Sequence, residues 1–166
     1  MASYNEIKAV LERDLRSQEA AYPLMDESMY SQVWLHPQPT ARVCLFLHGF
    51  TAGPYQFQPL GEKLYQAGYN VLAPLMPGHG RAGDWSKDNP PPLPTDSKEY
   101  LTFGVKWLNL AKQMGDKVVV GGLSGGGTLC SWLAYEKSSD IDRALLFAPY
   151  MSASLRVIDL FVNTFD

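Results

Sequence analysis

Hydrophobic residues follow two alternating patterns along this chain. Continuous apolar runs predict strands that are covered on both faces, and they lie at 41–47, 69–76, 116–123 and 142–150. Between and before them, apolar residues recur at helical spacing, in the stretches 5–18, 57–67, 96–115 and 125–135. Strands that alternate with helices form βαβ units. The pattern therefore predicts an α/β fold with a mainly parallel sheet and helices on both faces.

Finer features of the pattern set three further expectations. Val10, Leu11 and Leu15 share one face of the first helix and should be buried together. A short strand is expected at 31–36, before the first long run, and a further helix is expected to begin in 152–166. Asp96 and Glu99 should form a capping box at the start of their helix.

A long loop interrupts the alternation at 77–95. Its segment 88–94 contains three consecutive prolines, which can neither donate to a sheet nor sit inside a helix. Loops longer than about 12–15 residues are uncommon and often functional. We expect Trp85 to pack within this loop rather than to bind a cofactor.

Composition excludes several classes of function. The chain has 166 residues, 46% of them hydrophobic and 19% charged, with a net charge of -3, which is ordinary for a globular domain. Its scattered basic residues give no reason to expect a nucleic-acid partner. Cys44 and Cys130 lie in apolar segments and are expected to be buried thiols rather than a disulfide.

The sequence shows no membrane or export signal. The N-terminal residues are polar and charged, without the apolar core of a signal peptide. No run approaches the roughly 18 apolar residues of a membrane span. We therefore expect a cytoplasmic protein without a transmembrane segment.

The motif that carries chemistry is G-x-S-x-G at 122–126. It follows a predicted buried strand and precedes a predicted helix, which is the context of a nucleophile elbow. Gly122 and Gly126 provide the small residues that such a sharp turn requires, and Ser124 is the candidate nucleophile. The alternatives are a glycine-rich turn with an incidental serine and a phosphate loop, but the Lys-Ser/Thr of a phosphate loop is absent.

A second motif, LFLHGFT at 45–51, also leaves a strand directly into a glycine turn. The backbone N–H of Phe50 and that of Gly125 are the candidate donors of an oxyanion hole. We expect Phe50 and Thr51 to contact the substrate. His48 and His79, the latter in PGHG at 77–80, are expected to brace loops rather than to act as bases.

Taken in order, LFLHGF, PGHG and GLSGGG resemble the carboxylesterases and monoacylglycerol lipases of the α/β-hydrolase superfamily, over about Ala41–Tyr150. The resemblance implies an α/β-hydrolase fold and hydrolysis of a small-molecule carboxylic ester. It further implies an acyl-enzyme on Ser124, with neither metal nor cofactor.

The chain departs from that family after the serine. The family order is Ser, then Asp or Glu, then His, yet no histidine follows Ser124. None of the later aspartates has a clear post-strand position; they are Asp140, Asp142, Asp159 and Asp166. We therefore expect 1–166 to be a single incomplete core domain, with the C-terminal strands, the lid, the acid and the histidine outside this chain.

An incomplete domain of this kind would depend on the remainder of the enzyme, or on a covering chain, as its partner. Other readings stay open. The same scaffold supports thioesterases, acyltransferases and peptidases, and an α/β-hydrolase-like binding module can lack the triad. A complete short protein with an unusual base is the remaining alternative.

Overall fold

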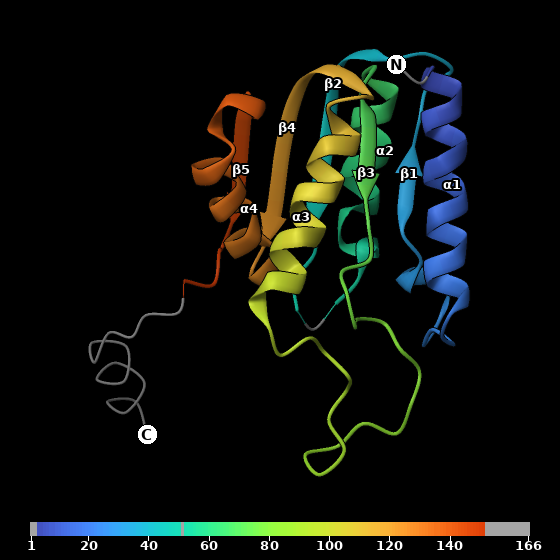
Figure 1. Cartoon of the computed structure of the whole chain (residues 1–166), viewed down its shortest axis with the longest axis vertical. Coiled ribbons are helices and arrows are strands. Elements are labelled where there is room, and N and C mark those ends of the chain that lie inside the picture. The colour runs from blue at the N-terminus through green and yellow to red at the C-terminus, as the bar shows by residue number, and fades with distance from the viewer. Residues whose placement is uncertain (1–2, 51, 152–166) are drawn as a thin grey trace.

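A mostly parallel sheet forms the centre of the molecule (Figure 1). The computed structural model describes residues 3–50 and 52–151. In this part of the chain the five strands have the order β1-β3-β2-β4-β5. Their bounds are Gln32–Trp34 (β1), Thr40–Leu47 (β2), Asn70–Ala73 (β3), Gly115–Leu123 (β4) and Arg143–Phe147 (β5). Only β1 runs antiparallel to its neighbour, so the predicted mainly parallel sheet is confirmed.

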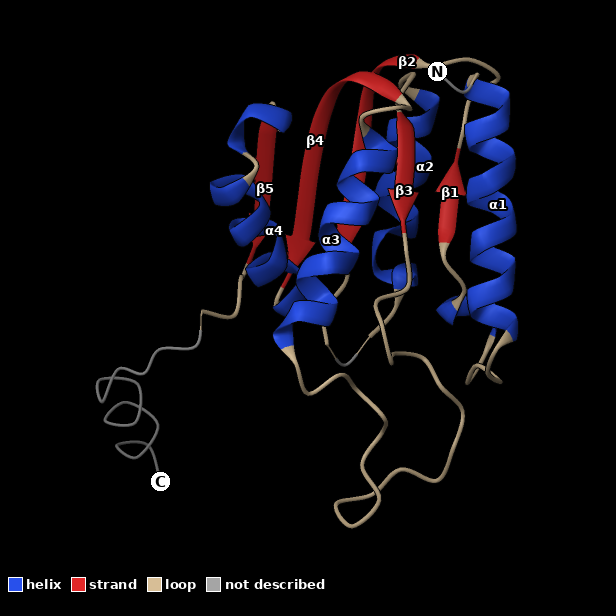
Figure 2. Cartoon of the chain, viewed as in Figure 1, coloured by secondary structure: helices blue, strands red, loops and turns tan. Residues whose placement is uncertain are grey.

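The described residues form four α-helices, and Figure 2 shows helices covering the sheet. They are α1 (Tyr4–Ala20), α2 (Gln58–Gln66), α3 (Ser97–Ala111) and α4 (Gly125–Glu136). The same part of the chain has three short 3-10 helices in its connections: η1 (Glu27–Met29), η2 (Pro54–Phe57) and η3 (Ser138–Asp140). The long loop predicted at 77–95 contains none of these elements.

Two hydrophobic clusters show which helices cover which face. Because alternate residues of a strand point to opposite faces, Val43, Leu45 and Leu47 of β2 pack with α1, α3 and α4. Cys44 and Phe46 of the same strand point the other way, toward η2 and α2. Helices therefore lie on both faces, as expected from the continuous apolar runs.

Both cysteines are buried free thiols, as expected. Burial raises the pKa of Cys44 and of Cys130 to about 12. Neither thiol is therefore ionised near neutral pH.

Several boundaries differ from the sequence-based expectation. Helix α1 extends beyond 5–18, and Val10 is 41% exposed although Leu11 and Leu15 on the same helix are buried. Helix α3 ends at Ala111, because the chain must turn before Gly115 starts β4. The expected capping box between Asp96 and Glu99 does not form, and Asp96 caps the helix alone.

At that helix start the Asp96 carboxylate accepts from the Lys98 N–H at 2.8 Å, and the Glu99 side chain returns no bond to the Asp96 backbone. Strand β3 stops at Ala73, one residue before Pro74, whose ring nitrogen has no hydrogen to donate.

The prediction that 142–150 is a buried strand is wrong for this chain. Strand β5 forms at Arg143–Phe147, but all five of its residues are exposed, because β4 is its only strand neighbour among the described residues. Leu145, Leu146 and Phe147 are 38–44% exposed. The further helix expected in 152–166 lies outside the described residues.

Candidate active site

The two motif-bearing turns meet at the carboxyl end of the sheet. Strands β2 and β4 are parallel neighbours, and Leu47 at the end of β2 pairs with Gly122 near the end of β4. The loops that follow must therefore leave the sheet side by side. A Cβ placed on Gly49 would lie 3.6 Å from the Ser124 Cβ, so the two turns are in van der Waals contact.

Ser124 occupies a strained backbone conformation between β4 and α4. Its φ is 51° and its ψ is -117°, a region that costs non-glycine residues about 1–3 kcal/mol. Its N–H donates to the Phe147 carbonyl oxygen at 3.0 Å, and its own carbonyl oxygen accepts from Thr128 at 3.0 Å and Tyr150 at 3.1 Å. The neighbouring strand and the first turn of α4 thus hold the strained backbone in place.

The Ser124 hydroxyl stabilises no part of the described structure through a hydrogen bond. A serine before a helix normally accepts a hydrogen bond from the first turn, but Ser124 makes no such side-chain bond to α4. Among the described residues its hydroxyl has no hydrogen-bond partner at all. The side chain is half-buried, so it remains accessible for chemistry.

The glycines two positions before and after Ser124 have no room for a side chain. A Cβ on Gly122 would overlap the carbonyl of Gly126, and a Cβ on Gly126 would overlap the carbonyls of Leu47 and His48. These neighbours are backbone atoms, which cannot move aside cheaply. The spacing of the motif is thus required by the close approach of β2, β4 and α4.

Phe50 lies over the first residue of α4. A Cβ on Gly125 would come within 2.7 Å of the Phe50 ring. The Phe50 ring is 45% exposed, whereas Gly125 is buried beneath it. Within the described part of the chain, neither the Phe50 N–H nor the Gly125 N–H donates a hydrogen bond. The Gly125 N–H also lies at the positive end of the α4 dipole.

His48 braces two loops, as predicted from the sequence. The Met76 N–H donates to Nε2 at 2.9 Å, so the proton must be on Nδ1, which donates to the Gly49 carbonyl oxygen at 2.8 Å. Burial lowers the pKa of His48 to about 4. Both ring nitrogens are engaged and the ring stays neutral, which rules out His48 as a general base in this arrangement.

His79 also has a packing role. Nδ1 donates to the Pro77 carbonyl oxygen at 2.9 Å. The ring stacks on Phe50 at 5.6 Å between centroids and meets Tyr100 at 6.2 Å. Burial lowers the pKa of His79, while the Pro77 carbonyl acts in the opposite direction. The ring therefore supports Phe50 from the loop after β3.

The first two aspartates after Ser124 in the sequence lie at the other end of the sheet. Asp142 accepts from the Val118 N–H at 2.8 Å, near the start of β5, and Asp140 forms an ion pair with Lys112 at 2.5 Å. His36 stacks on Tyr65 at 4.2 Å, and its backbone N–H donates to Asn70 at the start of β3. The side chains of Asp140, Asp142 and His36 thus bind or pack on other partners and do not contact Ser124.

Two supporting residues were missed from the sequence. Gln56 accepts from the Gly49 N–H at 2.9 Å and fixes the turn after β2. Tyr100, from α3, lies 5.4 Å from the Phe50 ring centroid. Neither belongs to a motif, and their role depends on tertiary packing. Thr51, expected to contact substrate, lies outside the described residues.

Known proteins are similar to this chain in sequence. The model of a family described as "Alpha/beta hydrolase family" matches residues 44–165. The chain is 38% identical over 90 residues to the thermostable monoacylglycerol lipase of Bacillus sp. strain H-257, covering 54% of this chain and 34% of that protein. It is 29% identical over 127 residues to putative esterase/lipase 3 of Mycoplasma pneumoniae, covering 75% and 43%.

A solved structure shows the same fold. The monoacylglycerol lipase of Paleococcus ferrophilus superposes with a TM-score of 0.58 at 19% identity, over 81% of this chain and 49% of that one. The chain thus spans about a third to a half of the length of these relatives. None of the described helices is long and apolar enough to span a bilayer.

Proposed function

This chain belongs to the α/β-hydrolase family, and from that premise we propose that it hydrolyses carboxylic esters through an acyl-enzyme on Ser124. The observation that carries the proposal is the Ser124 backbone at φ 51°, with a hydroxyl that does not cap α4. A strained turn that lifts an uncommitted hydroxyl above the sheet is what nucleophilic attack on an acyl carbonyl needs.

In the proposed reaction, Ser124 Oγ attacks the acyl carbonyl while a histidine takes its proton. The carbonyl oxygen becomes an oxyanion, which the Phe50 and Gly125 N–H groups stabilise. When this intermediate collapses, the C–O bond to the leaving group breaks, the histidine gives its proton to that oxygen, and the alcohol departs while the acyl group stays on Ser124. Water then attacks that ester, aided by the same histidine, and releases the carboxylic acid.

We assign the histidine and its orienting acid to polypeptide outside these 166 residues. All three histidines precede Ser124 in the sequence, and His48 has both ring nitrogens engaged. The complete enzyme is then this chain together with the segment that contributes both groups. In this proposal 1–166 is the first part of one core domain, in a cytoplasmic enzyme that acts on a small acyl ester.

Turnover of p-nitrophenyl esters by the complete enzyme tests the proposal. Ser124→Ala should reduce kcat by about 10⁶-fold, as loss of a triad nucleophile does. Ser131→Ala is the matched control, because Ser131 is also on α4 but only donates to the Gly127 carbonyl oxygen at 2.9 Å. Near-native turnover by Ser124→Ala would refute the assignment.

The acyl chemistry itself needs a separate measurement, since thioesterases, acyltransferases and peptidases use the same serine turn. A panel that presents one acyl group as an oxygen ester, a thioester and an amide should show the highest kcat/KM for the oxygen ester. Absence of turnover on every member would favour the binding-module reading.

A further inference from the structure

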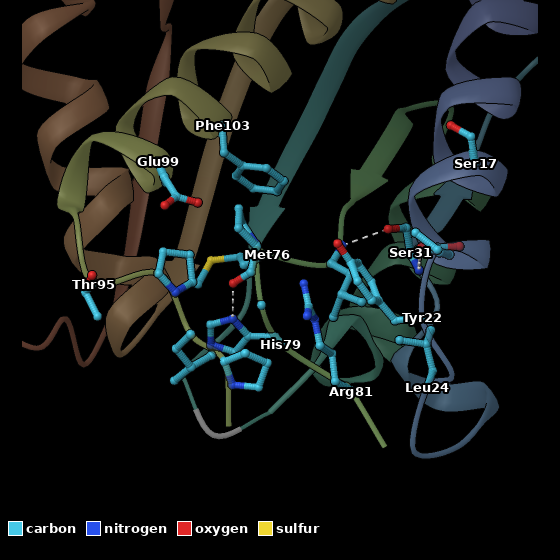
Figure 3. Close-up of a pocket in the computed structure, with 18 residues that line it drawn as sticks. Ser17, Tyr22, Leu24, Ser31, Met76, His79, Arg81, Thr95, Glu99 and Phe103 are labelled. Carbon is cyan, nitrogen blue, oxygen red and sulfur yellow. Dashed lines mark hydrogen bonds between the residues drawn. The ribbon is translucent and has the colours of Figure 1, made fainter. Parts of the chain in front are cut away.

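A cavity separate from the Ser124 turn opens between α1, the loop after β3 and the start of α3. Its volume is about 750 Å³, within the roughly 300–1,000 Å³ typical of small-molecule sites. Ser124, Phe50 and Gly125 do not line it, although His79, which stacks on Phe50, lies in its wall. Figure 3 shows its lining, with Phe103 on one side and Tyr22 on another.

Arg81 is the cationic side chain of this lining. Its guanidinium carbon lies 3.4 Å from the centroid of the Tyr22 ring, and Figure 3 shows the side chain pointing into the cavity beside that ring. Among the described residues, no carboxylate forms an ion pair with Arg81. The guanidinium also donates no hydrogen bond to any of them, so its N–H groups are available to a ligand.

The backbone holds Arg81 in this position. Leu24 and Arg81 form an antiparallel bridge. The Met25 N–H donates to the Gly80 carbonyl oxygen at 2.8 Å, and the Ala82 N–H donates to Pro23 at 2.9 Å. A fixed guanidinium is a pre-organised fork for a carboxylate or phosphate.

The rest of the lining is partly apolar and partly acidic. Leu75 and Phe103, both half-buried, provide apolar surface against which a hydrocarbon or aromatic body can pack. Of the two carboxylates in the lining, Glu19 accepts from the Ser31 N–H at 2.5 Å, and Glu99 is exposed in the first turn of α3. Arg81 is therefore the group in this lining that can pair with an anionic head group.

We propose that this cavity binds an organic anion, with a carboxylate or phosphate head on Arg81 and an apolar body along Phe103. The wall formed by α1 and residues 22–31 precedes the family match at 44–165. Arg81 and Phe103 themselves lie within that match, so the cavity joins the matched core to the segment before it. It does not depend on the chemistry proposed for Ser124.

Titration of the 166-residue chain with 2-naphthoate and 1-naphthyl phosphate tests this proposal, with 2-naphthamide as the uncharged control. We expect at least one anion to bind and the amide to bind much more weakly. The anion that binds more tightly shows whether the site prefers a carboxylate or a phosphate head group. Arg81→Gln should weaken anion binding about tenfold or more, since a charge-assisted hydrogen bond contributes that much.

Arg42→Gln is the matched control, because Arg42 also stacks on a tyrosine, Tyr69, at 5.6 Å, but lies outside this cavity. Tyr22→Leu keeps the charge, removes the supporting ring and should weaken binding severalfold. Ser124→Ala should bind as the wild type does, whatever its activity. Binding of neither anion, equal binding of the amide, or equal losses in Arg81→Gln and Arg42→Gln would each overturn the proposal.

Discussion

The Phe50 ring covers Gly125 so closely that a Cβ on Gly125 would lie 2.7 Å from ring atoms. This contact joins the turn after β2 to the first residue of α4. The two N–H groups proposed for the oxyanion hole belong to these same two residues. The relative position of these two N–H groups therefore depends on the close packing of the Phe50 ring on Gly125, which is possible because glycine has no Cβ.

Gly125→Ala should accordingly impair the proposed oxyanion hole in the complete enzyme. The added methyl group pushes the Phe50 ring, and with it the loop, away from α4. We expect kcat to fall by about 10²–10³-fold, as when one oxyanion donor is lost. In a Phe50→Ala background the same change should cost much less, because the clash is gone. Additive effects in this double-mutant cycle would contradict the packing argument.

The spacing of the elbow makes a prediction about stability. Gly126→Ala should lower the free energy of unfolding by about 3 kcal/mol or more, the upper range for overpacking, because its Cβ overlaps the Leu47 carbonyl. Gly68→Ala is the comparison, since Gly68 has φ 88° but open space around its Cβ. It should cost only about 1–2 kcal/mol. Urea unfolding of both variants measures the difference, and equal costs would contradict the steric account.

The sequence was informative where local pattern decides structure. Continuous apolar runs and the glycine spacing of 122–126 were sufficient to predict the sheet and the strand-turn-helix around Ser124. Packing between distant segments was not predictable. Tyr100 reaches Phe50 from α3, and Val10 is exposed although the helical pattern placed it on the buried face.

The error at β5 has a different cause. An apolar run indicates that a strand is suited to burial on both faces. It does not show how many strands and helices pack against that strand in a given chain. The run in 142–150 predicts burial on both faces, but among the described residues Leu146 is 44% exposed. The sequence pattern and the observed exposure together indicate a surface that favours association.

Self-association through β5 is therefore expected for the chain alone. Exposed apolar edge strands pair with other chains, so sedimentation velocity of 1–166 should show oligomers. Leu146→Lys should shift the distribution toward monomer. Val10→Lys is the control, because Val10 is 41% exposed on α1 and away from any strand edge. A monomeric wild-type chain, or an equal effect of both substitutions, would exclude the edge as the cause.

The lowered pKa of His48 predicts that the folded protein loses stability in acid. Its pKa is about 4 in the folded protein and about 6.5 in the unfolded chain, so the unfolded state binds more protons between these values. Stability is full above about pH 6.5 and falls as the pH approaches 4. From pH 7 to pH 5 the loss should be about 2 kcal/mol.

The comparison for this prediction is His48→Gln, which has no titratable group at this position. Urea titration at pH 7 and pH 5 gives the free energy of unfolding at each pH. Between these two values the free energy of unfolding of His48→Gln should fall by about 2 kcal/mol less than that of the wild type. An identical pH dependence in the two proteins would show that His48 does not titrate as the buried, hydrogen-bonded ring implies.

The most direct test of the central claim is covalent labelling of the complete enzyme with a fluorophosphonate, followed by peptide mass spectrometry. The account predicts a single adduct on the peptide that contains Ser124, and loss of that adduct in Ser124→Ala with the fold retained. Labelling of a different residue, or labelling that persists in Ser124→Ala, would contradict the claim that Ser124 is the nucleophile.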